Sequence, residues 1–211
     1  WMLILGCVGV FIWQLLLVPE ESDRVIALYA FNPARILSGG GYYTFVTSMF
    51  LHGGMLHIAG NMLYLYIFGD NVEDMCGHAR YLAFYLLVGI IASGAFMLSA
   101  WDSDIPAIGA SGAISGVLGS YVLLFPRVRI KTIVPIGIFV RFVRVPAFIM
   151  IGLWFLYQLL LGFGGLESGV AYWAHIGGFV AGLVLGKPFA YKRHGHPLYQ
   201  RQASRYGTSY V

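Results

Sequence analysis

Six apolar stretches separated by short polar segments dominate the chain. They lie at about residues 1–18, 45–68, 81–101, 105–125, 145–164 and 170–187. A transmembrane helix needs roughly 20 predominantly apolar residues, so the pattern predicts six membrane-spanning helices joined by short loops. A further apolar piece at 133–140 is too short to span and lies among basic residues. We expect it to form a loop that rests at the membrane interface.

The two ends of the chain have different predicted roles. The first 18 residues contain neither a charged leader nor a small-residue cleavage site, so we interpret them as a span whose beginning precedes Trp1 and not as a signal peptide. Residues from about 191 onward are polar and are predicted to be flexible. The expected organisation is a six-span membrane domain over 1–190 and a polar tail over 191–211.

The composition supports membrane residence. Of the 211 residues, 59% are hydrophobic and only 10% are charged, whereas a soluble domain carries about 25% charged residues. Two cysteines, Cys7 and Cys76, provide neither a disulfide framework nor a metal cluster. The sequence contains no nucleotide, metal or cofactor motif, so we expect no cofactor and no nucleic-acid partner.

Basic residues are concentrated between the fourth and fifth stretches and after the sixth. They are Arg127, Arg129, Lys131, Arg141, Arg144, Lys187, Lys192, Arg193, Arg201 and Arg205. Positively charged loops remain in the cytoplasm. Both termini are therefore predicted to be cytoplasmic, and a compact six-span chain is expected to be a multi-pass protein of the plasma or inner membrane. Spans two, four and six then begin at the outer face.

Ser111 lies at the start of the fourth stretch, between Gly109 and Gly112. Glycines allow a sharp backbone turn and close approach of a substrate, and the free N–H groups of a helix N-terminus suit a developing oxyanion. The same run of small residues is also typical of helices that pack together in membranes. Both interpretations remain open on this motif alone.

His175 precedes a glycine ridge in the sixth stretch. It shares a helical face with Gly178 and Gly182, and that spacing allows another helix to approach closely. Because Ser111 also lies on a small-residue face, the two helices could bring Ser111 and His175 within hydrogen-bond distance. A lone intramembrane histidine could equally make an interhelical hydrogen bond, relay protons or bind a metal.

A third polar cluster lies in the second stretch. His57 and Asn61 are four residues apart and face the same way, and such donors can line an oxyanion hole. His52 is expected to point elsewhere and to orient a loop. A structural hydrogen-bond network is the alternative, and a metal site of His52, His57 and His175 is conceivable, although no carboxylate or cysteine stands nearby in sequence.

The six stretches contain no acidic residue. A Ser–His dyad is therefore a simpler interpretation than a triad. His175 would accept the Ser111 proton and later protonate the leaving amine. Without an acid, we expect the packed glycine ridge to hold the imidazole in part.

Together, these clusters resemble the rhomboid family of intramembrane serine proteases. The resemblance runs from about Tyr43 to Gly186 and rests on HGGMLHIAGN, GASG and AHIGGFVAG, in that order. It implies an all-α polytopic bundle of six transmembrane helices. It also implies a serine endopeptidase that cuts single-span membrane proteins near the outer face of the bilayer.

The resemblance assigns roles residue by residue. Ser111 would be the nucleophile and His175 the base, while His57 and Asn61 would bind the oxyanion together with the Ser111 backbone N–H. The expected supporting residues are His52, Gly109 and Gly112. Gly69 and Glu73 match a G-x-x-x-E pattern that closes the second span.

Two positions depart from the family pattern. Tyr43 and Thr44 occupy the place of a Trp-Arg pair in many members, so the anchoring of the first loop is expected to differ. Ser115 stands where some members carry an aromatic residue beneath the histidine, so another residue must support His175.

By analogy with the family, the partners are transmembrane substrate proteins, which would enter from the lipid between spans two and five. Trp154, Phe155 and Tyr157 could form a gate there, or they could simply face lipid. The glycine-rich segment 162–173 before the sixth span could act as a mobile lid.

Two other functions fit part of the sequence. An inactive rhomboid-like protein would keep the fold and bind or escort membrane clients without needing Ser111. A small transporter or channel would use the histidines as a proton relay, but the lack of intramembrane carboxylates and of an evident repeat disfavours it.

Overall fold

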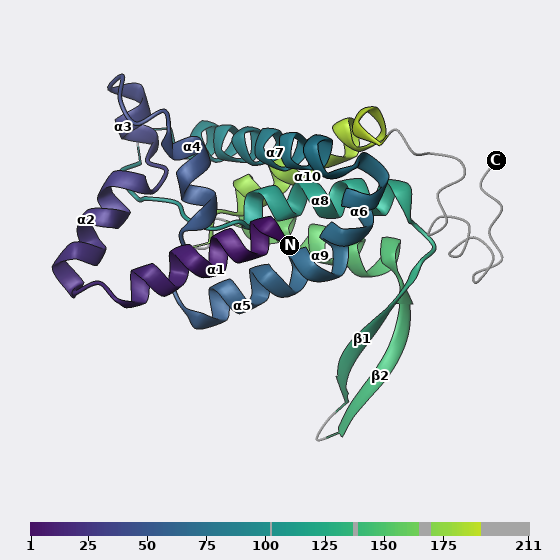
Figure 1. Ribbon diagram of the computed structural model, residues 1–211. Helices are drawn as coiled ribbons and strands as arrows, with labels where there is room; N and C mark the ends of the chain where they lie inside the picture. The colour runs from purple at the N-terminus through teal and green to yellow at the C-terminus, as the bar shows by residue number, and fades with distance from the viewer. Residues whose placement is uncertain (102, 137–138, 165–169, 191–211) are drawn as a thin grey trace.

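The computed structural model describes residues 1–101, 103–136, 139–164 and 170–190, and these are mostly helical (Figure 1). The elements in chain order are α1 (Met2–Leu15), α2 (Pro19–Tyr29), α3 (Pro33–Leu37), α4 (Thr44–Thr47), the 3₁₀ turn η1 (Ser48–Phe50), α5 (Met55–Tyr64), the π-helical turn η2 (Leu65–Gly69), α6 (Asp70–Cys76), α7 (His78–Ser99), α8 (Ser111–Leu124), β1 (Arg129–Ile136), β2 (Phe139–Pro146), α9 (Ala147–Phe163) and α10 (Tyr172–Phe189). The predicted tail at 191–211 and the centre of the predicted lid at 165–169 lie outside the described residues.

Helix α8 is the centre of the bundle. Every residue from Ala113 to Tyr121 is buried, and α10, α7 and the α5–α6 segment pack around it. The surrounding core includes Phe68, Phe84 and Tyr85, which are all fully buried. Because α8 is covered on all sides, its first residue is held by the whole bundle.

Glycines bring α8 and α10 into backbone contact. A Cβ added to Gly178 would collide with the carbonyl oxygen of Gly112, and one added to Gly182 would collide with that of Gly116. Small residues at such positions let membrane helices approach closely. The predicted packing of two small-residue faces is confirmed, and we call this contact the α8–α10 seam.

Two predicted spans begin later than expected. The stretch 45–68 is not one helix, because the backbone leaves the helical conformation at Leu51–Gly54 and α5 begins at Met55. The stretch 105–125 starts with extended backbone, in which Ala107 pairs with Phe31. Gly109 then has a φ of +122°, a conformation that favours glycine. Ser111 is consequently the first residue of α8.

The first loop contains two helices, α2 and α3, which the apolar pattern did not predict. The Arg35 guanidinium donates to the carbonyl oxygens of Ala27 and Leu28 and to the Tyr43 hydroxyl, at 2.9–3.0 Å. Tyr43 Oη in turn donates to Leu28 at 3.0 Å. Tyr43, one of the two departures from the family pattern, therefore anchors this loop together with Arg35.

The G-x-x-x-E pattern lies where α5, η2 and α6 form one continuous segment. A Cβ on Gly69 would stand 2.7 Å from the Tyr81 hydroxyl of α7. Glu73 Oε1 lies 2.7 Å from His78 Nδ1, at the start of the next helix. Both residues therefore join this segment to α7.

The expectation of an all-α chain is wrong at residues 129–146. A loop was expected at 133–140, but residues 129–136 and 139–146 form the antiparallel pair of β1 and β2, in which Ile133 pairs with Phe142 and Lys131 with Arg144. The segment is rich in β-branched and aromatic residues that alternate with cations, and such residues favour strands.

One helix of the described residues, α7 with 22 residues, is long and apolar enough to cross a membrane by length and composition. The apolar helices α1, α8 and α9 have 14, 14 and 17 residues. The count of six spans is therefore not confirmed and remains a prediction.

Candidate active site

Ser111 and His175 meet where α8 and α10 begin. Ser111 opens α8, His175 lies in the first turn of α10, and their Oγ and Nε2 atoms are 2.8 Å apart. The α8–α10 seam runs directly below this pair, so the backbone contacts at Gly178 and Gly182 fix the spacing of the two helices. The juxtaposition expected from the two small-residue faces is found.

A residue outside the three sequence motifs binds the other side of the imidazole. Gln158 Oε1, from α9, lies 2.8 Å from His175 Nδ1, and only 4% of Gln158 is exposed. A carbonyl oxygen can only accept, so Nδ1 carries the proton and Nε2 presents its lone pair to the Ser111 hydroxyl. The sequence contains a signal for Gln158, because a polar residue within an apolar membrane stretch is costly and usually functional.

Trp154 supports the imidazole ring in place of the expected glycine ridge. Its ring centroid lies 6.0 Å from that of His175 with the planes tilted by 37°. Ser115 does not reach the histidine, since its hydroxyl donates to the Ser111 carbonyl oxygen at 2.7 Å. The support expected beneath His175 therefore comes from α9 and not from α8.

His57 and Asn61 lie against the turn that leads into Ser111. The Gly53 N–H donates to His57 Nδ1 at 3.3 Å, so the neutral ring carries its proton on Nε2. A Cβ on Gly109 would lie 2.7 Å from that Nε2 and 3.6 Å from Asn61 Nδ2. Only glycine fits here, and both side chains border the same turn.

The Asn61 amide nitrogen is buried and has no hydrogen-bond partner in the part of the chain that the structure describes. A buried donor without a partner is costly, and each such case calls for an explanation. Its place beside the Ser111 turn suits a donor that is kept for a bound group. Together with His57 Nε2–H and the free N–H groups at the start of α8, the Asn61 amide provides several hydrogen-bond donors around the turn that leads into Ser111.

Residues 39–192 match the rhomboid domain family. The chain belongs to the rhomboid family of intramembrane serine proteases. It is 33% identical over 185 residues to rhomboid protease GluP of Bacillus subtilis and 28% identical over 201 residues to rhomboid protease AarA of Providencia stuartii. It is also 31% identical over 151 residues to Rhomboid protein 1, mitochondrial, of Saccharomyces cerevisiae.

These matches cover most of this chain but less of the relatives. They span 83%, 87% and 67% of the chain, and 33%, 69% and 40% of the Bacillus, Providencia and yeast proteins respectively. As a member of the rhomboid family, the chain is an integral multi-pass membrane protein. The resemblance inferred from three short motifs is confirmed.

His52 connects the candidate active site to α1. Its backbone N–H donates to Gln14 Oε1 at 3.1 Å, and Gln14 Nε2 donates to its carbonyl oxygen at 3.3 Å. Its ring meets that of His57 edge-on, with centroids 5.2 Å apart. This position fits the loop-orienting role expected of His52.

The aromatic residues of α9 do not all face outward. Trp154 contacts His175 and Phe179, and Phe155 stacks on Phe179 with centroids 4.2 Å apart. Tyr157, in contrast, is 57% exposed. Two of the three residues considered for a gate therefore pack on α10.

A cavity of about 40 Å³ adjoins Ser111, whereas a water molecule needs about 10–15 Å³. Its walls include Ser48, Ser93, Phe96, Gly109, Gly112 and Ala174. Among the described residues, no group of three or more His, Cys, Asp or Glu side chains could hold a metal ion. The structure thus gives no support to a metal site of His52, His57 and His175.

Proposed function

We propose that this chain is an intramembrane serine endopeptidase that cleaves single-span membrane proteins near the outer face of the bilayer. The observation that carries the proposal is the 2.8 Å contact between Ser111 Oγ and His175 Nε2, in a chain of the rhomboid family. Ser111 acts as the nucleophile and His175 as the general base.

Each proton transfer has a defined donor and acceptor. His175 Nε2 takes the Ser111 proton as Oγ attacks the scissile carbonyl carbon, and it then gives that proton to the leaving amine. Water, activated by the same nitrogen, hydrolyses the acyl-enzyme. The cavity beside Ser111 offers that water a place next to the ester.

The oxyanion is stabilised by donors that are already in position. His57 Nε2–H and Asn61 Nδ2–H border the turn at Gly109, and Ser111, which opens α8, provides its backbone N–H two residues later. Donors fixed in advance are worth about 10²–10³ in rate for each one removed. The unpartnered Asn61 amide gains its hydrogen bond when the negative charge develops.

Gln158 is a positioning residue in this mechanism. It keeps the proton on His175 Nδ1 and so leaves Nε2 free to act as the base. A neutral amide does this without burying a carboxylate, whose desolvation inside a membrane is costly.

The membrane arrangement that goes with this function is six spans with both termini cytoplasmic, formed by α1, the α5–α6 segment, α7, α8, α9 and α10. The basic hairpin and the basic residues that follow α10 support this orientation. Ser111 then lies at the outer end of α8. Substrates enter from lipid between α5 and α9, in the plasma or inner membrane.

The test is cleavage of a generic single-span protein by the purified chain in detergent, read by gel and mass spectrometry. Ser111→Ala and His175→Ala should each lower the rate by about 10⁴-fold or more. Ser99→Ala and His78→Ala are matched controls on exposed residues at the ends of α7 and should cleave like the wild type.

A fluorophosphonate probe gives a readout that does not depend on the choice of substrate. It should modify Ser111 in the wild type and leave Ser111→Ala unlabelled. A folded protein that neither cleaves nor takes up the probe would overturn the protease proposal and favour a client-binding protein. Cleavage that persists in Ser111→Ala would exclude this residue as the nucleophile.

A further inference from the structure

The β1–β2 hairpin projects from the helical bundle. Figure 1 shows it leaving the end at which α8 stops and α9 starts, and in this view it runs across the direction of α7 and α8. Its base is tied down, because Ala147 donates to the Val128 carbonyl at 2.8 Å and Phe148 donates to that of Pro126 at 3.1 Å. The distal part of the hairpin extends beyond the bundle.

The hairpin is strongly basic. Its strands and base carry five exposed cations: Arg127, Arg129, Lys131, Arg141 and Arg144. The chain has no Asp or Glu from residue 126 to residue 163. Within the described part of the chain, none of the five cations is paired with a carboxylate. Their charge is therefore available to an external anion.

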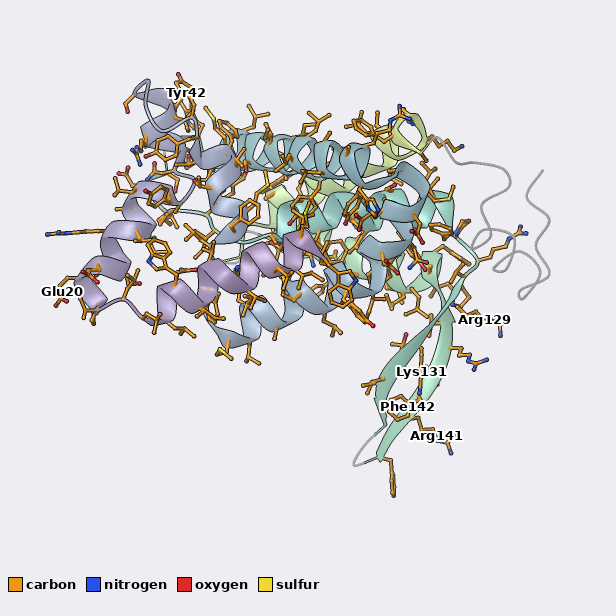
Figure 2. The ribbon with its side chains drawn as sticks, viewed as in Figure 1. Glu20, Tyr42, Arg129, Lys131, Arg141 and Phe142 are labelled. Carbon is orange, nitrogen blue, oxygen red and sulfur yellow. The ribbon has the colours of Figure 1, made fainter. Side chains whose placement is uncertain are left out.

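Large apolar side chains are exposed beside these cations. Ile133, Phe139 and Phe142 are 61%, 71% and 63% exposed. The register sets the Ile133–Phe142 pair next to the Lys131–Arg144 pair on one face, and Lys131 Nζ lies 4.5 Å from the centroid of the Phe142 ring. Figure 2 shows Arg129, Lys131, Arg141 and Phe142 on the projecting hairpin. Neighbouring exposed apolar side chains rimmed by charged residues are typical of surfaces that bind a protein or a membrane.

We propose that this hairpin binds anionic phospholipid headgroups of the protein's own membrane, in the leaflet opposite the Ser111 end. Basic residues next to a membrane are attracted to anionic lipids, and aromatic and aliphatic side chains insert at the headgroup boundary. Helix α8 separates Ser111 from the hairpin by about 20 Å at 1.5 Å per residue. The two sites therefore contact different leaflets.

The inference needs the multi-pass membrane placement, but it does not need the proposed catalysis. With the orientation proposed above, the leaflet is the cytoplasmic one, where anionic lipids give a negative surface potential. The five cations then act as a lipid contact in addition to setting the topology.

The test uses the full chain with Ile133→Cys carrying an environment-sensitive thiol fluorophore. The native Cys7 and Cys76 are both buried, and labelled wild type measures their background. The protein is reconstituted in phosphatidylcholine vesicles, with and without phosphatidylglycerol, and quenching by nitroxide-labelled lipid is measured. Phosphatidylglycerol should increase the quenching, and high salt should reverse that increase.

Charge variants test the electrostatic part. Each neutralised cation should lower the ratio of docked to free hairpin roughly fivefold, so Lys131→Gln combined with Arg141→Gln and Arg144→Gln should abolish the response to phosphatidylglycerol. Arg24→Gln neutralises an exposed cation of α2, outside the hairpin. It is the matched control for the single variant Arg141→Gln and should leave the response to phosphatidylglycerol unchanged. A label at Tyr42→Cys, at the opposite end of the bundle, should not respond to phosphatidylglycerol.

Three outcomes would overturn the proposal. They are equal quenching in neutral and anionic vesicles, no quenching in either, and a response to soluble RNA or inorganic phosphate but not to phosphatidylglycerol. Cleavage is measured on the same samples. If the Ser111–His175 pair is not catalytic, cleavage is absent but the quenching by phosphatidylglycerol vesicles still occurs. If the hairpin does not bind lipid, the quenching is absent but cleavage still occurs.

Discussion

The α8–α10 seam and the β1–β2 hairpin differ in where their residues find partners. In the seam, glycines bring two backbones into contact, and the polar side chains above them, Ser111 and His175, bind each other. In the hairpin, cations and aromatic residues are exposed, with no carboxylate in the surrounding segment. Polar side chains that bind each other inside the protein are held in a precise position, as the proposed catalytic pair requires. Cations and apolar side chains that are exposed, with no carboxylate beside them among the described residues, indicate an external partner.

The most severe way to break the seam is Gly182→Val. The new side chain would collide with the Gly116 carbonyl oxygen, which is backbone and cannot move aside. We expect a loss of about 3 kcal/mol in the free energy of unfolding and at least a 100-fold loss of cleavage, since a shift of about 1 Å at a catalytic pair costs that much. Denaturant titration and the cleavage assay measure the two effects.

Gly152→Val on α9 is the control for this prediction, because nothing lies within 4 Å of a Cβ at that position. It should retain both stability and activity. A folded, fully active Gly182→Val would mean that the spacing of the two helices does not set the Ser111–His175 contact.

The donors beside the seam should have the next largest effect. Asn61→Ala removes a buried amide without a partner among the described residues, so the free energy of unfolding should change little. The transition state loses one donor, which should lower kcat by about 10²–10³-fold with little change in KM. Asn71→Ala on α6 is the matched amide control. An unchanged kcat in Asn61→Ala would exclude Asn61 from the proposed oxyanion site.

Gln158 should have a smaller effect, which acts through His175. Gln158→Leu leaves the Nδ1–H buried without its acceptor, a loss of about 1–3 kcal/mol, so kcat should fall about 10- to 100-fold. Gln158→Glu keeps an acceptor oxygen and should restore much of the rate. Steady-state kinetics separate the cases, because a merely structural role would predict that Glu is no better than Leu.

The hairpin should be the least sensitive region in the absence of lipid. Arg141→Gln changes an exposed side chain, and such substitutions usually alter the free energy of unfolding by less than about 0.5 kcal/mol. Cleavage in detergent should equal that of the wild type. A large loss of stability in detergent would show that the hairpin cations have partners inside the protein and would weaken the contrast with the seam.

Several features of the site were predictable from local pattern. The GASG and AHIGGFVAG motifs identified the two residues that meet, and the glycine spacing predicted that their helices would pack. The spacing of His57 and Asn61 placed both on one side of α5. These predictions succeeded because helical periodicity and steric size are properties of short segments.

Other features were not predictable from hydrophobicity. The stretch 45–68 is apolar enough for one helix, yet the backbone breaks at Leu51–Gly54. The piece at 133–140 was expected to be a loop, yet residues 129–136 and 139–146 pair as strands. Apolar composition predicts that a segment leaves water, but it does not decide between a helix, a turn and a strand when the segment is short.

The sequence by itself determined the family, the membrane residence and the identity of the Ser111–His175 pair, because these depend on residue types at fixed spacings. Only the tertiary structure revealed that Gln158 and Trp154 hold the imidazole. They lie on α9, 17 and 21 residues before His175, and no local periodicity links them to it. Their contacts exist only because α9 packs against α10, so the choice of partner for a buried polar group is settled by the packing of whole helices.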